Sequence, residues 1–269
     1  MKKDLLNFLI IFITVLPAKA QEDLLINIDN RNSISLNGTW NYIVDPYETG
    51  FYNYRYRERN ENDPEAYWNR PVVKERTDRV EHGYEAHYTI DVRGAWNSQD
   101  DIFKYYEGTV WYQHEFDFNP IKDDQMVYLY FGAVNYEAHV YLNGRKLGSH
   151  KGGFTPFNFQ IPRDLLKDKN NFLVVKVDNK RHPQEIPTVN TDWWNFGGIT
   201  RDVELVIVPQ TFIRQYAIHL DENQDIARSK RTKRFDVEAK INLNKKATVT
   251  RVAIVIPELK VKDKTNGTE

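Results

Sequence analysis

Residues 141–148, YLNGRKLG, contain the clearest local structural signal in the chain. Asn143 and Gly144 adopt positive φ angles readily, and as an adjacent pair they suit the two central positions of a tight hairpin turn. The residues before them, 136–142 (YEAHVYL), have the alternation and the aromatic and β-branched composition of a strand. The stretch therefore predicts a β-hairpin with its turn at Asn143 and Gly144.

Other segments share this strand-like pattern, with short apolar runs bounded by turn residues. They are residues 109–118 (TVWYQHEFDF), 126–132 (MVYLYFG), 157–161 (FNFQI), 172–178 (FLVVKVD) and 202–208 (DVELVIV). Only residues 162–171 (PRDLLKDKNN) have helical character, and at that length they are expected to form one or two turns between strands. The pattern predicts an all-β fold, an antiparallel sandwich rather than a parallel α/β sheet.

A second β-domain is expected to start near Gln210, because Pro209 ends the last of these segments and strand-like alternation begins again afterwards. The further strands are expected at residues 211–220, 235–243 and 249–256. An immunoglobulin-like sandwich needs about 100 residues, more than the chain as printed has left after Pro209. We therefore expect this domain to be partial.

Residues 45–93 have no clear period. They contain many Tyr, Arg and Asn residues, and we expect them to form long loops over one end of the sandwich, where binding residues commonly lie.

The first twenty residues have the composition of a secretory signal peptide. Lys2 and Lys3 precede an apolar stretch at 5–16, and Ala18-Lys19-Ala20 supplies a small-x-small cleavage motif. The apolar stretch is too short to span a bilayer comfortably. We expect a mature chain that begins at Gln21, is periplasmic or secreted, and has no membrane attachment after cleavage. The chain has no cysteine, so it has neither a lipid anchor on cysteine nor a disulfide.

The charge balance gives no indication of nucleic-acid binding, since 37 basic and 38 acidic residues leave a net charge of -1. The basic run at 228–234 (RSKRTKR) is interpreted as a solvated hairpin loop. The seven histidines are scattered without the spacing of metal ligands. We expect no metal and no cofactor.

Blocks of the sequence, taken together and in order, resemble the amino-terminal sugar-binding domain of glycoside hydrolase family 2, the β-glucuronidase and β-galactosidase family. The blocks are residues 36–56 (LNGTWNYIVDPYETGFYNYRY), 92–99 (VRGAWNSQ), 105–116 (YYEGTVWYQHEF), 127–161, which contains the hairpin, and 192–205 (DWWNFGGITRDVEL). The resemblance implies a signal peptide at 1–20, a galactose-binding-like jelly-roll β-sandwich at 21–209 and the start of an immunoglobulin-like β-sandwich at 210–269. The chain as printed ends before the family's catalytic TIM barrel, which carries two glutamates.

The resemblance implies an exported hydrolase, a β-glucuronidase or a β-galactosidase acting on polysaccharides or oligosaccharides, of which this chain is the sugar-binding part without the catalytic glutamates. Its partner would be a carbohydrate with a β-linked uronic acid or galactose. For the chain as printed we expect no hydrolysis of aryl β-glucuronides or β-galactosides. A non-catalytic carbohydrate-binding module and an inactive truncated remnant are the alternatives. The identity of the sugar stays open. The oligomeric state also stays open, with a homo-oligomer as one of the options.

The block that begins DWWNFGG contains the candidate binding residues. The family resemblance implies that Asp192 reaches the sugar and accepts hydrogen bonds from its hydroxyls, with Trp193, Trp194 and Asn195 beside it; the alternative role for Asp192 is a loop-capping acid. Adjacent residues of an extended segment point to opposite sides. One tryptophan is therefore expected to anchor in the core, while the other faces the sugar.

Two neighbouring features complete the candidate site. Gly197 and Gly198 are expected to let the backbone turn sharply or pass close to a neighbour. Tyr106 and Glu107 precede a strand that the resemblance places near the substrate, which makes them a candidate wall of the same pocket.

Overall fold

The computed structural model describes residues 24–52, 55–57, 84, 88–119, 121–186, 188–220 and 237–243. The chain forms two compact units, residues 1–210 and 211–269. Within the described ranges no helix has the length and apolar character that a membrane crossing requires. The signal peptide expected at 1–20, the basic run at 228–234 and the strand expected at 249–256 lie outside the described residues.

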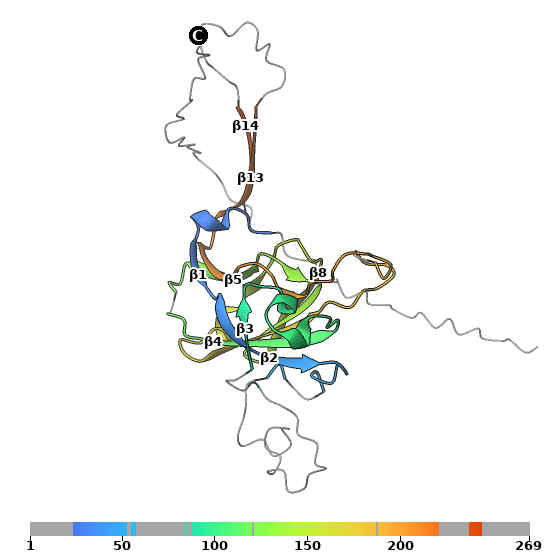
Figure 1. Ribbon diagram of the computed structural model, residues 1–269. Helices are drawn as coiled ribbons and strands as arrows, with labels where there is room; N and C mark the ends of the chain where they lie inside the picture. The colour runs from blue at the N-terminus through green and yellow to red at the C-terminus, as the bar shows by residue number, and fades with distance from the viewer. Residues whose placement is uncertain are drawn as a thin grey trace, which may run out of the picture. The chain divides into compact units, whose positions relative to one another are not determined.

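The first unit is a jelly-roll sandwich of antiparallel strands (Figure 1). One sheet has the order β1, β12, β5, β9, with bounds Asn32–Ser35, Val203–Pro209, Gln125–Phe131 and Phe157–Ile161. The other has the order β3, β2, β4, β10, β7, β8, with bounds Thr89–Val92, Gly38–Asp45, Thr109–Phe116, Asn171–Asp178, Glu137–Leu142 and Arg145–Lys151. A short ladder joins β6 (Val134–Asn135) to β11 (Gly198–Ile199). Apart from the β7–β8 hairpin, most neighbouring strands are far apart in sequence, which is why no local pattern reveals the full strand order.

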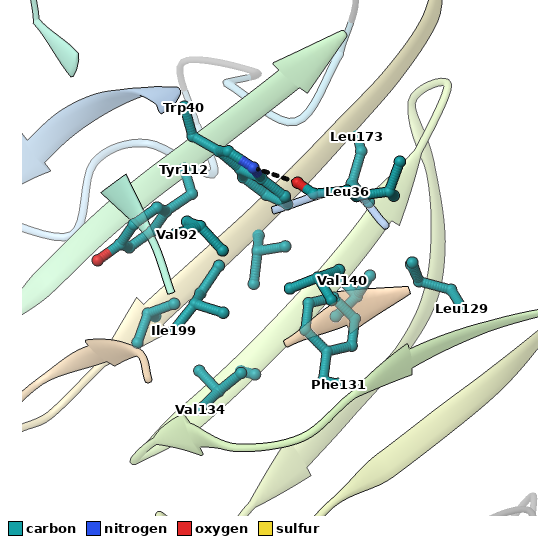
Figure 2. Packing of buried hydrophobic residues seen from close by; sticks show 14 of the residues in the cluster. Leu36, Trp40, Val92, Tyr112, Leu129, Phe131, Val134, Val140, Leu173 and Ile199 are labelled. Carbon is teal, nitrogen blue, oxygen red and sulfur yellow. Dashed lines mark hydrogen bonds between the residues drawn. The ribbon is translucent and has the colours of Figure 1, made fainter. Parts of the chain in front are cut away.

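The main core is formed by apolar side chains from both sheets. Leu173 and Val140 of the six-stranded sheet and Leu129 and Phe131 of the four-stranded sheet are almost completely buried in one cluster (Figure 2). Trp40 lies in the same cluster, and its indole N–H donates to the Leu36 carbonyl oxygen at 2.8 Å, so its polar atom is satisfied in the interior. The period-two alternation of the strands produces this arrangement, because alternate residues face the same side.

A second, smaller core covers the outer face of the six-stranded sheet. Trp111, Tyr141 and Phe172 are buried there, and Tyr56 stacks on Tyr141 with ring centroids 5.0 Å apart. The buried Asp45 carboxylate accepts the Trp111 indole N–H at 2.8 Å. The central strands are therefore buried on both faces, which explains why 172–178 is a nearly continuous apolar run rather than an alternating one.

The predicted hairpin is confirmed. Asn143 and Gly144 have φ angles of 49° and 79°, and they join β7 to β8. The six segments predicted as strands in the first unit all form strands. The segment predicted to be helical forms only a three-residue 3-10 turn, Arg163–Leu165. Asn171 explains why the turn does not continue, since its side-chain amide binds both the N–H and the carbonyl oxygen of Lys167.

The expectation of loops throughout residues 45–93 is wrong at its end. Thr89–Val92 forms β3, which pairs with Gly38–Asn41 of β2 at the edge of the six-stranded sheet. A four-residue strand is too short to show a period in the sequence, and its pairing partner lies about fifty residues earlier. Residues 58–83 lie outside the described part of the chain.

The second unit contains an antiparallel pair of strands, β13 (Ile213–Leu220) and β14 (Val237–Leu243). Both lie within segments that the sequence predicts as strands. The register shifts between Ile213 and Gln215, which marks a bulge or irregularity near the start of β13.

Candidate functional site

The candidate residues lie on the loop that connects β10 to β11, residues 179–197, which we call the Asp192 loop. Asp192 is exposed, and Trp193 and Trp194 expose 77% and 46% of their surface. The prediction that one tryptophan anchors in the core is therefore wrong. It assumed an extended segment with alternating faces, whereas residues 193 and 194 belong to no strand and both side chains are exposed.

A partly buried arginine holds the backbone on both sides of Asp192. The Arg181 guanidinium donates from Nη1 to the Thr191 carbonyl oxygen at 2.7 Å and from Nη2 to the Trp193 carbonyl oxygen at 2.6 Å. Its Nε lies 3.3 Å from Oε1 of Glu107, and only 14% of its side chain is exposed. The planar, forked donor set of arginine suits the two carbonyl bonds, which a lysine could not make together. Asp192 is thus fixed through its neighbours while its carboxylate stays exposed.

The base of the loop is closed by two buried asparagines. The Asn195 Nδ2 donates to the Asn179 carbonyl oxygen at 2.6 Å, and the Asn179 Nδ2 donates to the Asn195 carbonyl oxygen at 3.2 Å. The Asn179 Oδ1 accepts the Gly108 N–H at 2.8 Å. Both asparagines are at most 6% exposed. Asn195, a predicted sugar ligand, therefore points inward and secures the loop. Its contact with sugar stays a prediction.

Gly197 and Gly198 lead the chain back into the sandwich. A Cβ atom on Gly197 would lie 2.1 Å from Cζ2 of Trp96, closer than any real contact. The Gly197 carbonyl oxygen accepts the Trp96 N–H at 2.9 Å, and Gly198 has a φ angle of 120°. The prediction of a close approach at these glycines is confirmed.

Exposed aromatic rings follow Asp192 along the loop, and some of them contact one another. The Trp194 ring lies 5.2 Å from that of Tyr105 and 6.4 Å from that of Phe196, tilted by about 40° in each case. Tyr105 and Phe196 are 78% and 50% exposed. We call Tyr105, Trp193, Trp194 and Phe196 the aromatic surface. A group of large exposed rings is a candidate interaction site, because monomeric proteins rarely expose large contiguous apolar patches.

The candidate wall residues have structural roles in the described part of the chain. The Tyr106 hydroxyl donates to the Thr109 carbonyl oxygen at 2.9 Å, and burial, together with the nearby Asp45 and Asp178 carboxylates, raises the pKa of Tyr106. The Glu107 carboxylate forms an ion pair with Arg181. No group of three or more potential metal ligands occurs among the described residues.

Arg181 and Asn179 were not predicted from the sequence, and Glu107 was predicted only as part of a pocket wall. Arg181 and Asn179 act on backbone groups that lie 10 to 71 residues away, and Glu107 acts on the Arg181 side chain. An arginine just after a strand that ends in a long polar loop is the one available signal, and it does not specify which carbonyls the side chain binds.

The arrangement offers an exposed carboxylate on a backbone that Arg181 holds, with exposed aromatic rings on neighbouring residues. A carboxylate accepts hydrogen bonds from neighbouring hydroxyl groups, and aromatic rings pack against apolar faces while they exclude water. The described loop presents no nucleophile paired with a base. The site can therefore bind and orient a polyhydroxylated ligand.

Comparison with known families and proteins agrees with this chemistry. The family model described as "Glycosyl hydrolases family 2, sugar binding domain" matches residues 34–209. A beta-galactosidase of Thermoanaerobacter pseudethanolicus is 37% identical over 124 residues, which are 45% of this chain and 16% of that protein. A beta-glucuronidase of Bacteroides fragilis is 33% identical over 128 residues, 46% of this chain and 18% of that protein. The chain thus spans less than a fifth of the length of these relatives.

Solved structures show the same fold. A beta-glucuronidase of an uncultured Clostridium species superposes with a TM-score of 0.62 at 24% identity, over 84% of this chain and 36% of that one. A β-glucuronidase of Ruminococcus gnavus in complex with D-glucuronic acid gives a TM-score of 0.63 at 20% identity, over 85% of this chain and 37% of that one. At these identities the likeness concerns the fold alone.

Proposed function

The chain belongs to glycoside hydrolase family 2 through its sugar-binding domain, and we propose that it forms the sugar-binding part of an exported β-glucuronidase or β-galactosidase of that family. The named relatives support both activities. The observation that carries the proposal is the pair of hydrogen bonds from Arg181 to the carbonyls on either side of the exposed Asp192. A binding carboxylate benefits from such hydrogen bonds, because a loop that is already ordered loses less conformational entropy when the ligand binds.

In the proposed role the Asp192 carboxylate accepts hydrogen bonds from two adjacent hydroxyls of the sugar next to the bond that is cleaved. Hydrogen bonds to an ionised acceptor are shorter and stronger than neutral ones. The aromatic surface packs around the sugar or against the domain that cleaves it, and it excludes water. The residues of this chain bind and orient the sugar, and the bond is broken by carboxylic residues supplied from elsewhere in the enzyme.

The two candidate sugars place different demands on the site. A uronic acid has a carboxylate that Asp192 would repel, so this residue would face the hydroxyl edge of either sugar. The group that distinguishes a glucuronide from a galactoside would then be recognised by residues outside the Asp192 loop.

A free-standing carbohydrate-binding module is the second candidate function. The exposure of the aromatic surface favours it, since stacking rings that are accessible in the chain by itself can hold a glycan without a cleavage site. Calorimetry of the chain with uronic-acid and galactose oligosaccharides tests this function. Binding by the chain alone supports the module, and no heat at about millimolar ligand opposes it.

The main proposal is tested on protein expressed from its complete reading frame. We expect hydrolysis of an aryl β-glucuronide or β-galactoside, and we expect Asp192→Asn to lower kcat/KM by about a hundredfold, since an ionised hydrogen-bond acceptor at the reacting sugar is lost. Unchanged kcat/KM in Asp192→Asn, with either substrate, would refute the role of Asp192.

Export is tested on the same expressed protein. Mass spectrometry of the chain recovered from the periplasm or the medium should give an amino terminus at Gln21. An intact residue 1 on protein that stays in the cytoplasm would contradict export.

A further inference from the structure

One member of the aromatic surface, Tyr105, lies outside the Asp192 loop, on the segment of residues 95–107. Its ring contacts that of Trp194, with centroids 5.2 Å apart. The Tyr105 side chain is 78% exposed, so most of the ring is accessible to a ligand. The two rings form a single exposed surface from two segments that are far apart in the sequence, and this surface continues from the Asp192 loop onto the neighbouring segment.

Asn97 fixes this segment to the end of the Asp192 loop. Its Oδ1 accepts the Gly197 N–H at 2.8 Å, and its Nδ2 donates to the Phe103 carbonyl oxygen at 2.8 Å. The Phe103 side chain is buried in the main core, so the backbone just before Tyr105 is anchored there. Both sides of the contact between Tyr105 and Trp194 are thus held in place, and a ligand that binds across them has little of the chain to order.

Lys104 brings a positive charge to the same surface. Its Nζ lies over the Tyr105 ring, 5.7 Å from the ring centroid, and the residue is exposed. A cation over an exposed aromatic ring is attracted only weakly, so this contact orients the Lys104 side chain without neutralising its charge. The ammonium group keeps N–H donors available for an anion.

The lysine and the arginine of the Asp192 loop are already engaged with carboxylates. The Nζ of Lys180 lies 2.6 Å from Oε1 of Glu48. The Nε of Arg181 lies 3.3 Å from Oε1 of Glu107. Lys104, by contrast, forms no ion pair with any carboxylate in the part of the chain that the structure describes. It is therefore the cation beside the loop that a negatively charged ligand can reach without displacing a partner.

The charges of Lys104 and Asp192 define which ligand matches the surface. No ion pair joins these two described residues, so the surface offers both an ammonium and a carboxylate to a ligand. A uronic acid presents a group to each of them, because its hydroxyls donate to Asp192 while its carboxylate accepts from Lys104. The C–H face of the same sugar packs on the Tyr105 ring. A neutral sugar leaves the Lys104 ammonium without a partner.

We propose that Lys104 and Tyr105 form a subsite for an acidic sugar, in which Lys104 selects a uronate over a neutral residue of the glycan. The Lys104 ammonium binds the uronate carboxylate, and the Tyr105 ring supports the sugar. The inference rests on the proposed function, because it takes the Asp192 loop to be a sugar-binding site. It adds to that function a specificity-determining residue on this chain, outside the Asp192 loop.

The test is an NMR titration of the 269-residue chain with methyl β-glucuronide and with the methyl ester of that compound, which has the same ring and hydroxyls but no charge. We expect the acid to bind about fivefold more tightly than the ester, the gain from one exposed ion pair. Lys104→Met keeps the apolar stem and removes the charge. It should lower the affinity for the acid to that for the ester and leave the ester unaffected. Lys104→Arg should restore the preference, and Tyr105→Leu should weaken the binding of both ligands.

Asp192→Asn separates this subsite from the role of Asp192. It should weaken the binding of both ligands, while the acid still binds more tightly than the ester. The subsite is overturned if the acid binds no more tightly than the ester, or if Lys104→Met keeps the preference. It is also overturned if neither ligand binds at about 50 mM, where a site with a Kd of about 1 mM is nearly full. A failure of the Asp192 role would look different, since Asp192→Asn would then bind both ligands like the unchanged chain and the preference that depends on Lys104 would persist.

Discussion

The sandwich core and the Asp192 loop are held in place by different kinds of force. In the core, many apolar side chains from both sheets share the burial, and no single contact decides the structure. In the loop, a few polar side chains, Arg181, Asn179 and Asn195, make the bonds that fix the backbone. The difference means that a loss in the core lowers the stability of the whole sandwich, whereas the position of the loop depends on individual hydrogen bonds. A binding residue can be rigid without being part of the core.

The largest expected effect is a loss of core packing. Leu173 is fully buried between the two sheets, and Leu173→Ala should lower the free energy of unfolding by about 2–5 kcal/mol, from lost burial and the cavity left behind. Urea denaturation followed by tryptophan fluorescence measures this. Trp194→Ala on the loop is the comparison variant and should cost far less, because its ring is half exposed. Equal losses in the two variants would contradict the distinction.

The next effect lies where the loop meets the core. Gly197→Ala places a methyl group against the buried Trp96 ring, where its Cβ would be 2.1 Å from Cζ2. Forced overpacking of this kind costs about 1–3 kcal/mol. We expect a lower Tm and a changed environment of Trp96, visible in near-ultraviolet circular dichroism. A chain as stable as the original would show that this junction is loosely packed.

The sandwich was predictable and the loop anchors were not, for a physical reason. The strands depend on a repeated local pattern, and the turn at Asn143 and Gly144 depends on two adjacent residue types. Arg181 and Asn179 instead act on backbone groups that any residue could supply, so their partners have no signature in the sequence. The same reasoning explains the error at Trp193 and Trp194, where adjacent positions gave a strand-like expectation for residues that are not in a strand.

Breaking the Arg181 clamp should loosen the loop while it leaves the sandwich folded. Arg181→Met keeps the apolar stem and removes both bonds to the carbonyls of Thr191 and Trp193. We expect faster amide hydrogen exchange across residues 191–195 and a loss of about 1–2 kcal/mol in global stability, since charged donors are lost from a partly buried site. Arg181→Lys should not restore the protection, because an ammonium cannot span both carbonyls.

Glu107→Gln is the control for the clamp. It removes the charge partner at 3.3 Å from Nε but keeps the two carbonyl bonds, so exchange at 191–195 should change less than in Arg181→Met. If the amides of the two variants exchange equally fast, the ion pair with Glu107, rather than the two hydrogen bonds to the carbonyls, holds the loop.

Acid should weaken the sandwich through His114. Its ring stacks on Trp40 with centroids 4.9 Å apart, and burial lowers the pKa of His114 in the folded chain. The unfolded chain therefore takes up the proton first, and the free energy of unfolding falls as the pH drops through about 6.5 toward the lower folded pKa. His114→Phe keeps a stacked ring without a proton site and should give a shallower fall between pH 7 and pH 5, measured by urea denaturation. His139 and His150, whose pKa values burial also lowers, preserve part of the slope. An unchanged slope would show that His114 titrates alike in both states.

The smallest effect on stability is expected at the residue with the largest proposed effect on function. Asp192 is exposed, and its carboxylate makes no described hydrogen bond or ion pair, so Asp192→Asn should change the free energy of unfolding by less than about 0.5 kcal/mol. Hydrogen exchange at residues 191–195 should also stay as it is, because Arg181 binds the carbonyls of the neighbours rather than the carboxylate. A stabilising role, such as capping the loop, would instead appear as a measurable loss in both experiments. Unchanged stability and exchange, combined with lost sugar contact in the complete protein, would mean that the loop is built to support a carboxylate that contributes nothing to the fold.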